Sequence, residues 1–198
     1  MRISVKTLIA DCVNEVIRKH YPAKYYSLCH LYAIVGSNLA SIVGARNFRP
    51  VAGLAAVDCG DGQLMLMADN SAFSRSEGGA FHCWIESADG VNSEREVIDL
   101  TFRHNHTYAE KNGFQWTMAP PPAFLWGDYC DIVLEATLEH LPKNFPEGRI
   151  WLSETSAGRA WMTQHLFEHQ NAFVALTAEA LTLFSRAMLS PESNFNEI

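Results

Sequence analysis

The sequence predicts an α+β fold in which helices at both ends of the chain surround an antiparallel β-sheet formed by its middle part. Apolar residues recur every three or four positions in residues 3–19 and again in residues 171–189, which is the period of a helix with one buried face. Residues 51–102 instead show short apolar runs separated by glycine-containing turns, which is typical of strands. The chain has 198 residues, 48% of them hydrophobic and 19% charged, so we expect one domain over residues 1–198.

Two helices are predicted in the first quarter of the chain. The first covers residues 3–19 and ends before Pro22, because the residue before a proline is disfavoured in the helical conformation. The second begins near Ser27, a residue type that often caps helix N-termini, and it has no Asp, Glu, Lys or Arg from Leu28 to Ala45. Its histidine, serines, asparagine and glycines dilute the apolarity expected of a membrane span. We therefore interpret it as a buried central helix with Cys29 at about its second position.

The middle of the chain is predicted to form two hairpins. The segments "VAGLAAVD" and "QLMLMAD" flank the turn "CGDG", and "FHCWIES" and "EVIDLTF" flank "ADGVNS". A second hairpin that is symmetric about the Gly90/Val91 bond places His82 directly opposite Asp99, near enough for a carboxylate to hold an imidazole. Because side chains alternate between the two faces of a strand, Cys83 is expected to point away from the face of His82.

The second half of the chain has fewer regular patterns. Residues 103–125 are predicted to be irregular, since the three prolines at 120–122 end any regular element there. The segment "DIVLEATLEHL" is consistent with either a strand or a short helix. Residues 155–169 and 171–189 are predicted to be helices, and the second of them carries a continuous apolar stripe. This stripe consists of Phe173, Leu176, Ala180, Leu181, Phe184 and Met188.

Charge and cysteine content narrow the class of protein. The formal net charge is −7, and the fifteen Lys and Arg residues are scattered, so we expect neither nucleic acid nor a membrane as a partner. The five cysteines form an odd number without the spacing of a disulfide framework. The first twenty residues lack the apolar core of a signal peptide. Together these features predict a cytoplasmic protein.

The position of Cys29 raises the question of whether it reacts or only packs. The N-terminus of a helix favours an anion such as a thiolate, but by only about 0.3–1 kcal/mol, which is less than one pKa unit. A strongly activated thiol needs a second cation, and a histidine beside the sulfur is the usual one. That imidazole must itself be oriented by a third group, and the predicted pairing of His82 with Asp99 supplies one.

These residues resemble the papain-like cysteine proteinase superfamily, especially its transglutaminase-like and arylamine N-acetyltransferase-like branches. The resemblance covers residues 25–102 and depends on a cysteine before "HLYAIVGSNLA", on "HCWIES" and on "VIDLT", in that order. The chain is also similar to a small, uncharacterised bacterial family with this fold. The resemblance implies that Cys29 opens the buried helix as the nucleophile, that His82 is general base and acid, and that Asp99 orients it. The backbone N–H of Cys29 would be one oxyanion donor.

The sequence also departs from these families. Papain-type proteases carry a glutamine six residues before the cysteine, where this chain has Ala23, and no "RGG" precedes Cys29 as in the acetyltransferases. The second oxyanion donor is therefore open, with Tyr25, Tyr26 and Gln115 as candidates. We expect a cysteine-dependent hydrolase or acyltransferase that forms a thioester with an amide or acyl substrate. The alternative is a catalytically inactive papain-like binding or interaction domain.

Metal chemistry is a third possibility. His104 and His106 flank one residue, and His165 and His169 are four residues apart on a predicted helix, a spacing that can present two ligands on one side. No third ligand follows from the pattern, and the Glu of metalloprotease motifs is missing after His165. We therefore expect no metal and no cofactor. The expected partner is a small-molecule or peptide amide substrate, and the expected state is a monomer or homodimer.

Overall fold

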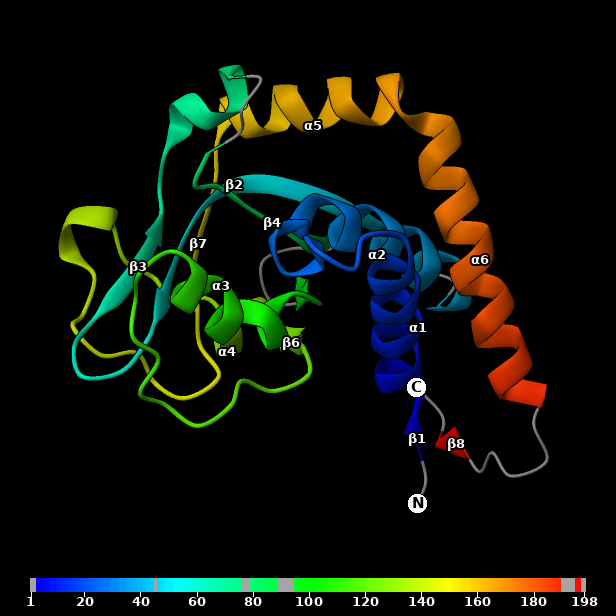
Figure 1. The fold of residues 1–198 in the computed structure, drawn as a ribbon, viewed down its shortest axis with the longest axis horizontal. Coiled ribbons are helices and arrows are strands. Elements are labelled where there is room, and N and C mark those ends of the chain that lie inside the picture. Colours follow the sequence, from blue (N-terminus) through cyan, green and yellow to red (C-terminus); the bar gives the residue numbers. More distant parts are fainter. Residues whose placement is uncertain (1–2, 45, 76–78, 89–94, 190–194, 197–198) are drawn as a thin grey trace.

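The computed structural model describes residues 3–44, 46–75, 79–88, 95–189 and 195–196. It has a mixed α+β architecture with an antiparallel sheet and helices at both ends, as predicted (Figure 1). The main helices and strands are α1 (Val5–His20), α2 (Cys29–Gly44), β2 (Phe48–Asp58), β3 (Leu64–Met67), β4 (His82–Ser87), β5 (Glu96–Asp99), α3 (Asn105–Lys111), β6 (Leu125–Asp128), α4 (Tyr129–Ile132), β7 (Trp151–Glu154), α5 (Ser156–Glu168) and α6 (Gln170–Leu189). The minor elements are β1 (Ile3–Ser4), β8 (Phe195–Asn196) and the short 3₁₀ turns η1 (Tyr25–Ser27), η2 (Asn70–Ser74), η4 (Phe102–His104) and η5 (Leu138–His140).

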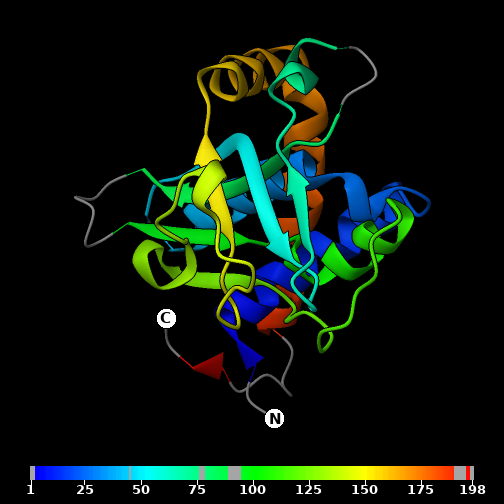
Figure 2. The same ribbon diagram turned by 90° about the vertical axis from the view of Figure 1, so that its left-hand side faces the viewer.

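The six-stranded sheet has the order β3-β2-β4-β5-β6, and β7 also pairs with β2. The long helices α1, α2 and α6 lie together beside the sheet, whereas the short helices α3 and α4 lie in the part of the molecule that contains β6 (Figures 1 and 2). One hydrophobic cluster joins α1, α2 and α6 to the sheet, and a second cluster joins other sheet residues to Ala109 of α3 and Ile132 of α4. The sheet is therefore covered by apolar side chains on both faces.

Helix α1 confirms the predicted N-terminal helix. It begins at Val5 because Ser4 acts as its N-cap, with the Ser4 hydroxyl accepting a hydrogen bond from the Thr7 backbone N–H. Helices α5 and α6 confirm the two predicted C-terminal helices, and α6 packs along α1 and α2. Among the described helices, α6 is the one whose length and apolar composition could by themselves cross a membrane.

Helix α2 is buried through its centre, as predicted, but it starts later than expected. Ser27 closes the 3₁₀ turn η1, and the helix begins at Cys29, because the backbone at Leu28 leaves the helical conformation (φ −101°, ψ 44°). Gly36 lets the helix approach the sheet closely, since a Cβ at this position would meet the side chains of Leu100 and Ile85. Cys29 is therefore the first residue of a helix that is held firmly on the sheet.

The second hairpin forms with a register that differs from the predicted one. Ile85 lies opposite Ile98, whereas the symmetric turn would have placed it opposite Glu96. The observed register is shifted by two residues, and it pairs two isoleucines that are both buried in the core beneath α2. Because a shift of two residues preserves the face, His82 and Asp99 still lie on the same side of the sheet. Residues 89–94, which contain most of the predicted turn, lie outside the described residues.

The region predicted to be irregular contains regular structure. Residues 105–111 form α3, whose Ala109 is buried in the second hydrophobic cluster, and β6 pairs with β5 after the three prolines. The segment "DIVLEATLEHL" forms the end of α4 and the turn η5 rather than a strand. The short strand β7 was not predicted, and it pairs with β2 at Gly53, where a Cβ would collide with the carbonyl of Ser153. These elements are stabilised by long-range contacts that leave no periodic pattern.

Candidate active site

Cys29 lies at the N-terminus of α2, where the structure leaves backbone donors available. The first helical hydrogen bonds that reach outside α2 are those from Leu31 and Tyr32 to the Leu28 carbonyl. No described carbonyl accepts a hydrogen bond from the backbone N–H of Cys29 or His30. These two groups are among the unpaired donors that every helix start presents, and together with the helix dipole they favour a negative charge. The Cys29 side chain is half-buried and lines a cavity.

His82 and Asp99 form a buried pair, as the sequence predicted. His82 Nε2 lies 2.9 Å from Asp99 Oδ2, and the two residues are only 2% and 1% exposed. The other carboxylate oxygen, Oδ1, accepts hydrogen bonds from the backbone N–H and the hydroxyl of Thr101 at 2.9 and 2.7 Å. Because Thr101 fixes one oxygen, the carboxylate holds the imidazole in a single orientation.

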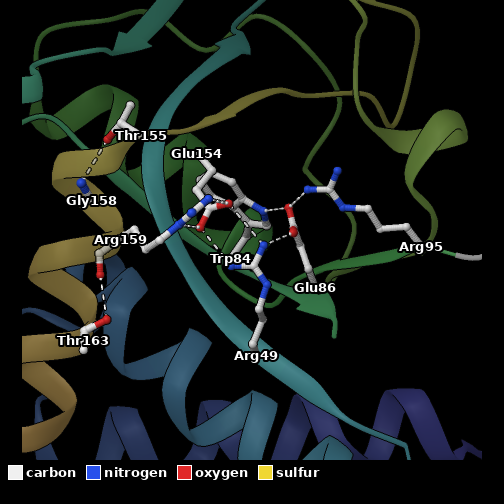
Figure 3. Close-up of polar contacts among 9 residues, drawn as sticks. All are labelled: Arg49, Trp84, Glu86, Arg95, Glu154, Thr155, Gly158, Arg159 and Thr163. Carbon is white, nitrogen blue, oxygen red and sulfur yellow. Dashed lines mark hydrogen bonds and ion pairs between the residues drawn. The ribbon is translucent and has the colours of Figure 1, made fainter. Parts of the chain in front are cut away.

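The buried carboxylate of Glu86 is the centre of a charge network next to the Trp84 indole (Figure 3). The His82 imidazole stacks on the Trp84 indole, with ring centroids 6.4 Å apart and planes at 17°. The indole N–H donates to Glu86, which is 1% exposed and also accepts hydrogen bonds from Arg49 and Arg95. Two guanidinium groups thus compensate the buried carboxylate, and the carboxylate fixes the indole against which His82 rests.

The Cys29 thiol is surrounded by groups that favour its ionised form. A hydrogen bond from Cys83 lowers the pKa of Cys29 most, and hydrogen bonds with His30 and His82 and the charge of His82 lower it further, so that it falls well below its usual value despite burial. Burial opposes protonation of His82, but the charge and hydrogen bond of Asp99, together with Cys29, raise its pKa to about 10. These shifts favour a thiolate–imidazolium pair at pH values above the lowered pKa of Cys29 and below the pKa of about 10 of His82.

Cys83 takes part in the site in a way that the sequence did not predict. The expected alternation is confirmed, because Cys83 belongs to the cluster beneath α2 and Trp84 to the cluster on the other face. Nevertheless the Cys83 thiol contacts Cys29, since Cys29 lies where the helix meets the start of β4. Burial first, and then the neighbouring Cys29, raise the pKa of Cys83, so Cys83 remains a protonated donor. The sequence also did not predict that His30 contacts the Cys29 thiol. The only feature of the sequence that could have indicated this contact is that His30 directly follows Cys29.

Replacing Cys83 by alanine is expected to raise the pKa of Cys29, because the thiolate loses its strongest hydrogen bond. A hydrogen bond to a charged group contributes about 1.5–3 kcal/mol, so the acid limb of the pH–rate profile for alkylation of Cys29 by iodoacetamide should move up by about one to two pH units. The measurement is the alkylation rate of the Cys29 peptide as a function of pH. Cys83→Ser keeps a donor at this position and should retain more of the rate. A pH profile unchanged in Cys83→Ala would contradict the role of this hydrogen bond.

Cys29 and His82 line a cavity of about 520 Å³. Its walls come from the turn before α2, from the start of β4, and from α3 and α5, and they are rich in aromatic rings. The lining includes Tyr26, Phe81, His82, Asn105, Tyr108 and Trp161. The cation Arg75 also lines the cavity, where it forms an ion pair with Asp69. Cys29 is therefore reachable by a ligand from a pocket of the size that small molecules occupy.

Of the three residues considered as the second oxyanion donor, only Tyr26 lines this cavity. The ring of Tyr25 packs edge-on against His104, 4.9 Å away, beneath the guanidinium of Arg18. Gln115 is exposed, and its backbone N–H is bonded to the side chain of Gln63. Tyr25 and Gln115 are therefore not among the residues that contact the cavity.

Of the histidines considered as metal ligands, His165 also lines the cavity, whereas His104, His106 and His169 are not among its lining residues. His104 is bonded to the Tyr32 hydroxyl and to Asn14, and burial followed by nearby arginines lowers its pKa to about 4. The rings of His165 and His169 are 4.7 Å apart, and burial followed by His30 lowers the pKa of His165 to about 4. His106 packs near Trp116. Within the described ranges, no group of three or more His, Cys, Asp or Glu side chains is placed to hold a metal ion.

The fold of this chain is similar to that of a protein of known structure. No family model matches the chain, and no curated protein matches its sequence. The crystal structure of genomics APC5867 has a similar fold, with a TM-score of 0.56 and 16% sequence identity to this chain. The alignment covers 96% of this chain and 80% of that one. At this identity the match supports the α+β architecture over nearly the whole chain, and any activity must be inferred from the site.

Proposed function

We propose that this protein is a cysteine-dependent hydrolase or acyltransferase with a papain-like, transglutaminase-like architecture. The proposal depends on one observation: Cys29 contacts His82, and His82 contacts Asp99, at the wall of a cavity. These three residues are called the relay below. A nucleophile, a base in contact with it and a group that orients the base are the arrangement that nucleophilic catalysis requires. The substrate class is an amide or a related acyl compound.

In the proposed reaction, the Cys29 thiolate attacks the carbonyl carbon of the substrate. The new sulfur–carbon bond moves the π electrons of the carbonyl onto its oxygen, and the backbone N–H of Cys29 donates to this oxyanion. Because Nε2 of His82 is held by Asp99, its Nδ1 faces the reacting groups and gives its proton to the leaving amine or alcohol. Collapse of the tetrahedral intermediate breaks the bond to the leaving group and leaves a thioester on Cys29.

The second half of the reaction uses the same groups in reverse. His82, now neutral, accepts a proton from an incoming water or amine, which attacks the thioester carbonyl. The second tetrahedral intermediate then releases the acyl product and restores the thiolate beside the imidazolium. Hydrolysis and acyl transfer differ only in the incoming nucleophile, so one site serves both reactions.

Trapping the thioester tests the proposal against the alternative of an inactive binding domain. Incubation with p-nitrophenyl acetate near pH 6, followed by acid quenching, should yield a peptide with one acetyl group on Cys29. The exposed Cys130 serves as an internal reference for an ordinary surface thiol. Selective acetylation of Cys29, read by mass spectrometry, supports the enzyme. Acetylation of Cys130 at least as fast as that of Cys29 would favour the binding domain.

A further inference from the structure

Asn105 is a cavity residue that the proposed relay does not use. It is the first residue of α3 and contributes to the wall of the cavity that contains Cys29. Asn105 is 4% exposed, and its amide nitrogen Nδ2 is buried without a hydrogen-bond partner in the described part of the chain. A buried polar group without a partner lowers stability, so an unsatisfied amide in the wall of the cavity that contains Cys29 indicates a function that requires it free.

The surrounding structure holds Asn105 at a fixed position relative to the relay. The preceding residue, His104, is anchored by the Tyr32 hydroxyl and by Asn14. The segment that leads to α3 starts at Asp99, whose carboxylate is bonded to the backbone of Thr101. Helix α3 also packs against η1, the turn immediately before Cys29. Asn105 thus follows an anchored residue and begins a helix that packs against the turn before α2.

We propose that Asn105 is the second oxyanion donor, and this rests on the proposed function of Cys29 as a nucleophile. When the thiolate adds to the substrate carbonyl, the electron pair that moves onto oxygen is stabilised by two donors. These are the backbone N–H of Cys29 and the Nδ2–H of Asn105. Rotation about the last side-chain bond of Asn105 exchanges its amide oxygen and nitrogen, so the donor can turn toward the oxyanion.

A donor at Asn105 would explain how the site can stabilise an oxyanion although Ala23 stands where papain-type proteases carry a glutamine. The glutamine expected six residues before the cysteine is replaced in function by an amide that comes from α3, on another part of the chain. Tyr26 and Tyr108, whose side chains carry hydroxyl groups, also line the cavity. However, of the cavity-lining residues that the structure describes, only Asn105 has a buried side-chain polar atom without a partner. The carboxamide is therefore the group with an unfilled hydrogen bond to offer.

The test compares two reactions of Cys29 that differ in their need for an oxyanion donor. Acylation by p-nitrophenyl acetate forms an oxyanion, whereas alkylation by iodoacetamide displaces iodide and forms none. Asn105→Leu, which replaces the amide with an apolar side chain of similar size, should slow acylation by about 10²–10³-fold. It should change the alkylation rate by less than about twofold and raise the melting temperature, because a buried unpaired amide is removed.

Control measurements distinguish an error in the role of Asn105 from an error in the role of Cys29. Asn112→Ala, at the exposed C-terminal end of the same helix, should leave both rates unchanged. Acylation of Asn105→Leu within about threefold of the wild-type rate would overturn the assignment, and so would an equal fall in both reactions. Loss of acylation in Tyr26→Phe but not in Asn105→Leu would show that Tyr26, and not Asn105, is the second oxyanion donor. Slow alkylation of Cys29 in the wild-type protein would instead overturn the nucleophile itself. If Asn105→Leu does not fold, the same comparison is made with Asn105→Ala.

Discussion

Replacing Cys29 by serine is expected to reduce acylation by p-nitrophenyl acetate by about 10⁴-fold or more, the scale of loss seen when a catalytic nucleophile is removed. A serine hydroxyl stays protonated at neutral pH, so it does not form the anion that the start of α2, Cys83 and His82 stabilise in the wild-type protein. The measurement is the release of p-nitrophenolate together with mass spectrometry of the acid-quenched protein. Selective labelling by iodoacetamide near pH 6 should disappear in the same variant.

The matched control for this experiment is Cys130→Ser, which removes an exposed thiol on α4. It should retain acylation at the wild-type rate, because Cys130 is not among the residues that line the cavity. A folded Cys29→Ser protein that releases p-nitrophenolate as fast as the wild type would show that another group reacts. In that case Cys29 would be a structural thiol.

Replacing Asp99 by asparagine is expected to lower acylation by about 10⁴-fold near neutral pH, as in serine hydrolases that lose the orienting carboxylate. Asp99 supplies the charge and hydrogen bond that overcome the burial of His82, so the pKa of His82 should fall in this variant. The loss of imidazolium in turn removes part of the support for the thiolate, so the pKa of Cys29 should rise. The acid limb of the pH–rate profile should therefore move to higher pH, while its basic limb moves lower.

Thr101→Val provides the control for Asp99→Asn. It removes the hydroxyl that donates to Asp99 Oδ1, but the backbone N–H of Thr101 and the carboxylate itself remain. The loss of acylation should be much smaller than in Asp99→Asn, and the pH profile should keep its position. The role assigned to Asp99 is wrong if Asp99→Asn, folded and with Cys29 intact, retains the wild-type pH profile of alkylation.

Much of the fold could be predicted from local patterns. The apolar stripes of α1 and α6, the charge-free run of α2 and the hairpin "CGDG" were all recognised, because a helix or strand that packs on a core repeats its apolar residues with its own period. The short helix α3 and the strands β6 and β7 were not recognised. They are held by pairing and packing with distant parts of the chain, which leave no period in four to seven residues.

The relay could be predicted in part for a similar reason. Residue type and chain order singled out Cys29, His82 and Asp99, and the assumed hairpin was wrong in register by two residues. The pair survived this error because strand side chains repeat every second residue, so a shift of two changes the neighbour but not the face. The contact itself, at 2.9 Å, is consequently diagonal rather than directly cross-strand.

Local composition and spacing were thus enough to identify a buried helix that begins near a cysteine, and a histidine and carboxylate on one face of a hairpin. The packing of the chain decided that Cys83 and His30 contact the thiol, that Tyr25 and Gln115 lie away from the cavity, and that Asn105 lines it. The physical reason is that periodicity reports which side of an element is buried. The distance between side chains on different elements depends instead on how helices and strands pack together, and no single segment encodes it.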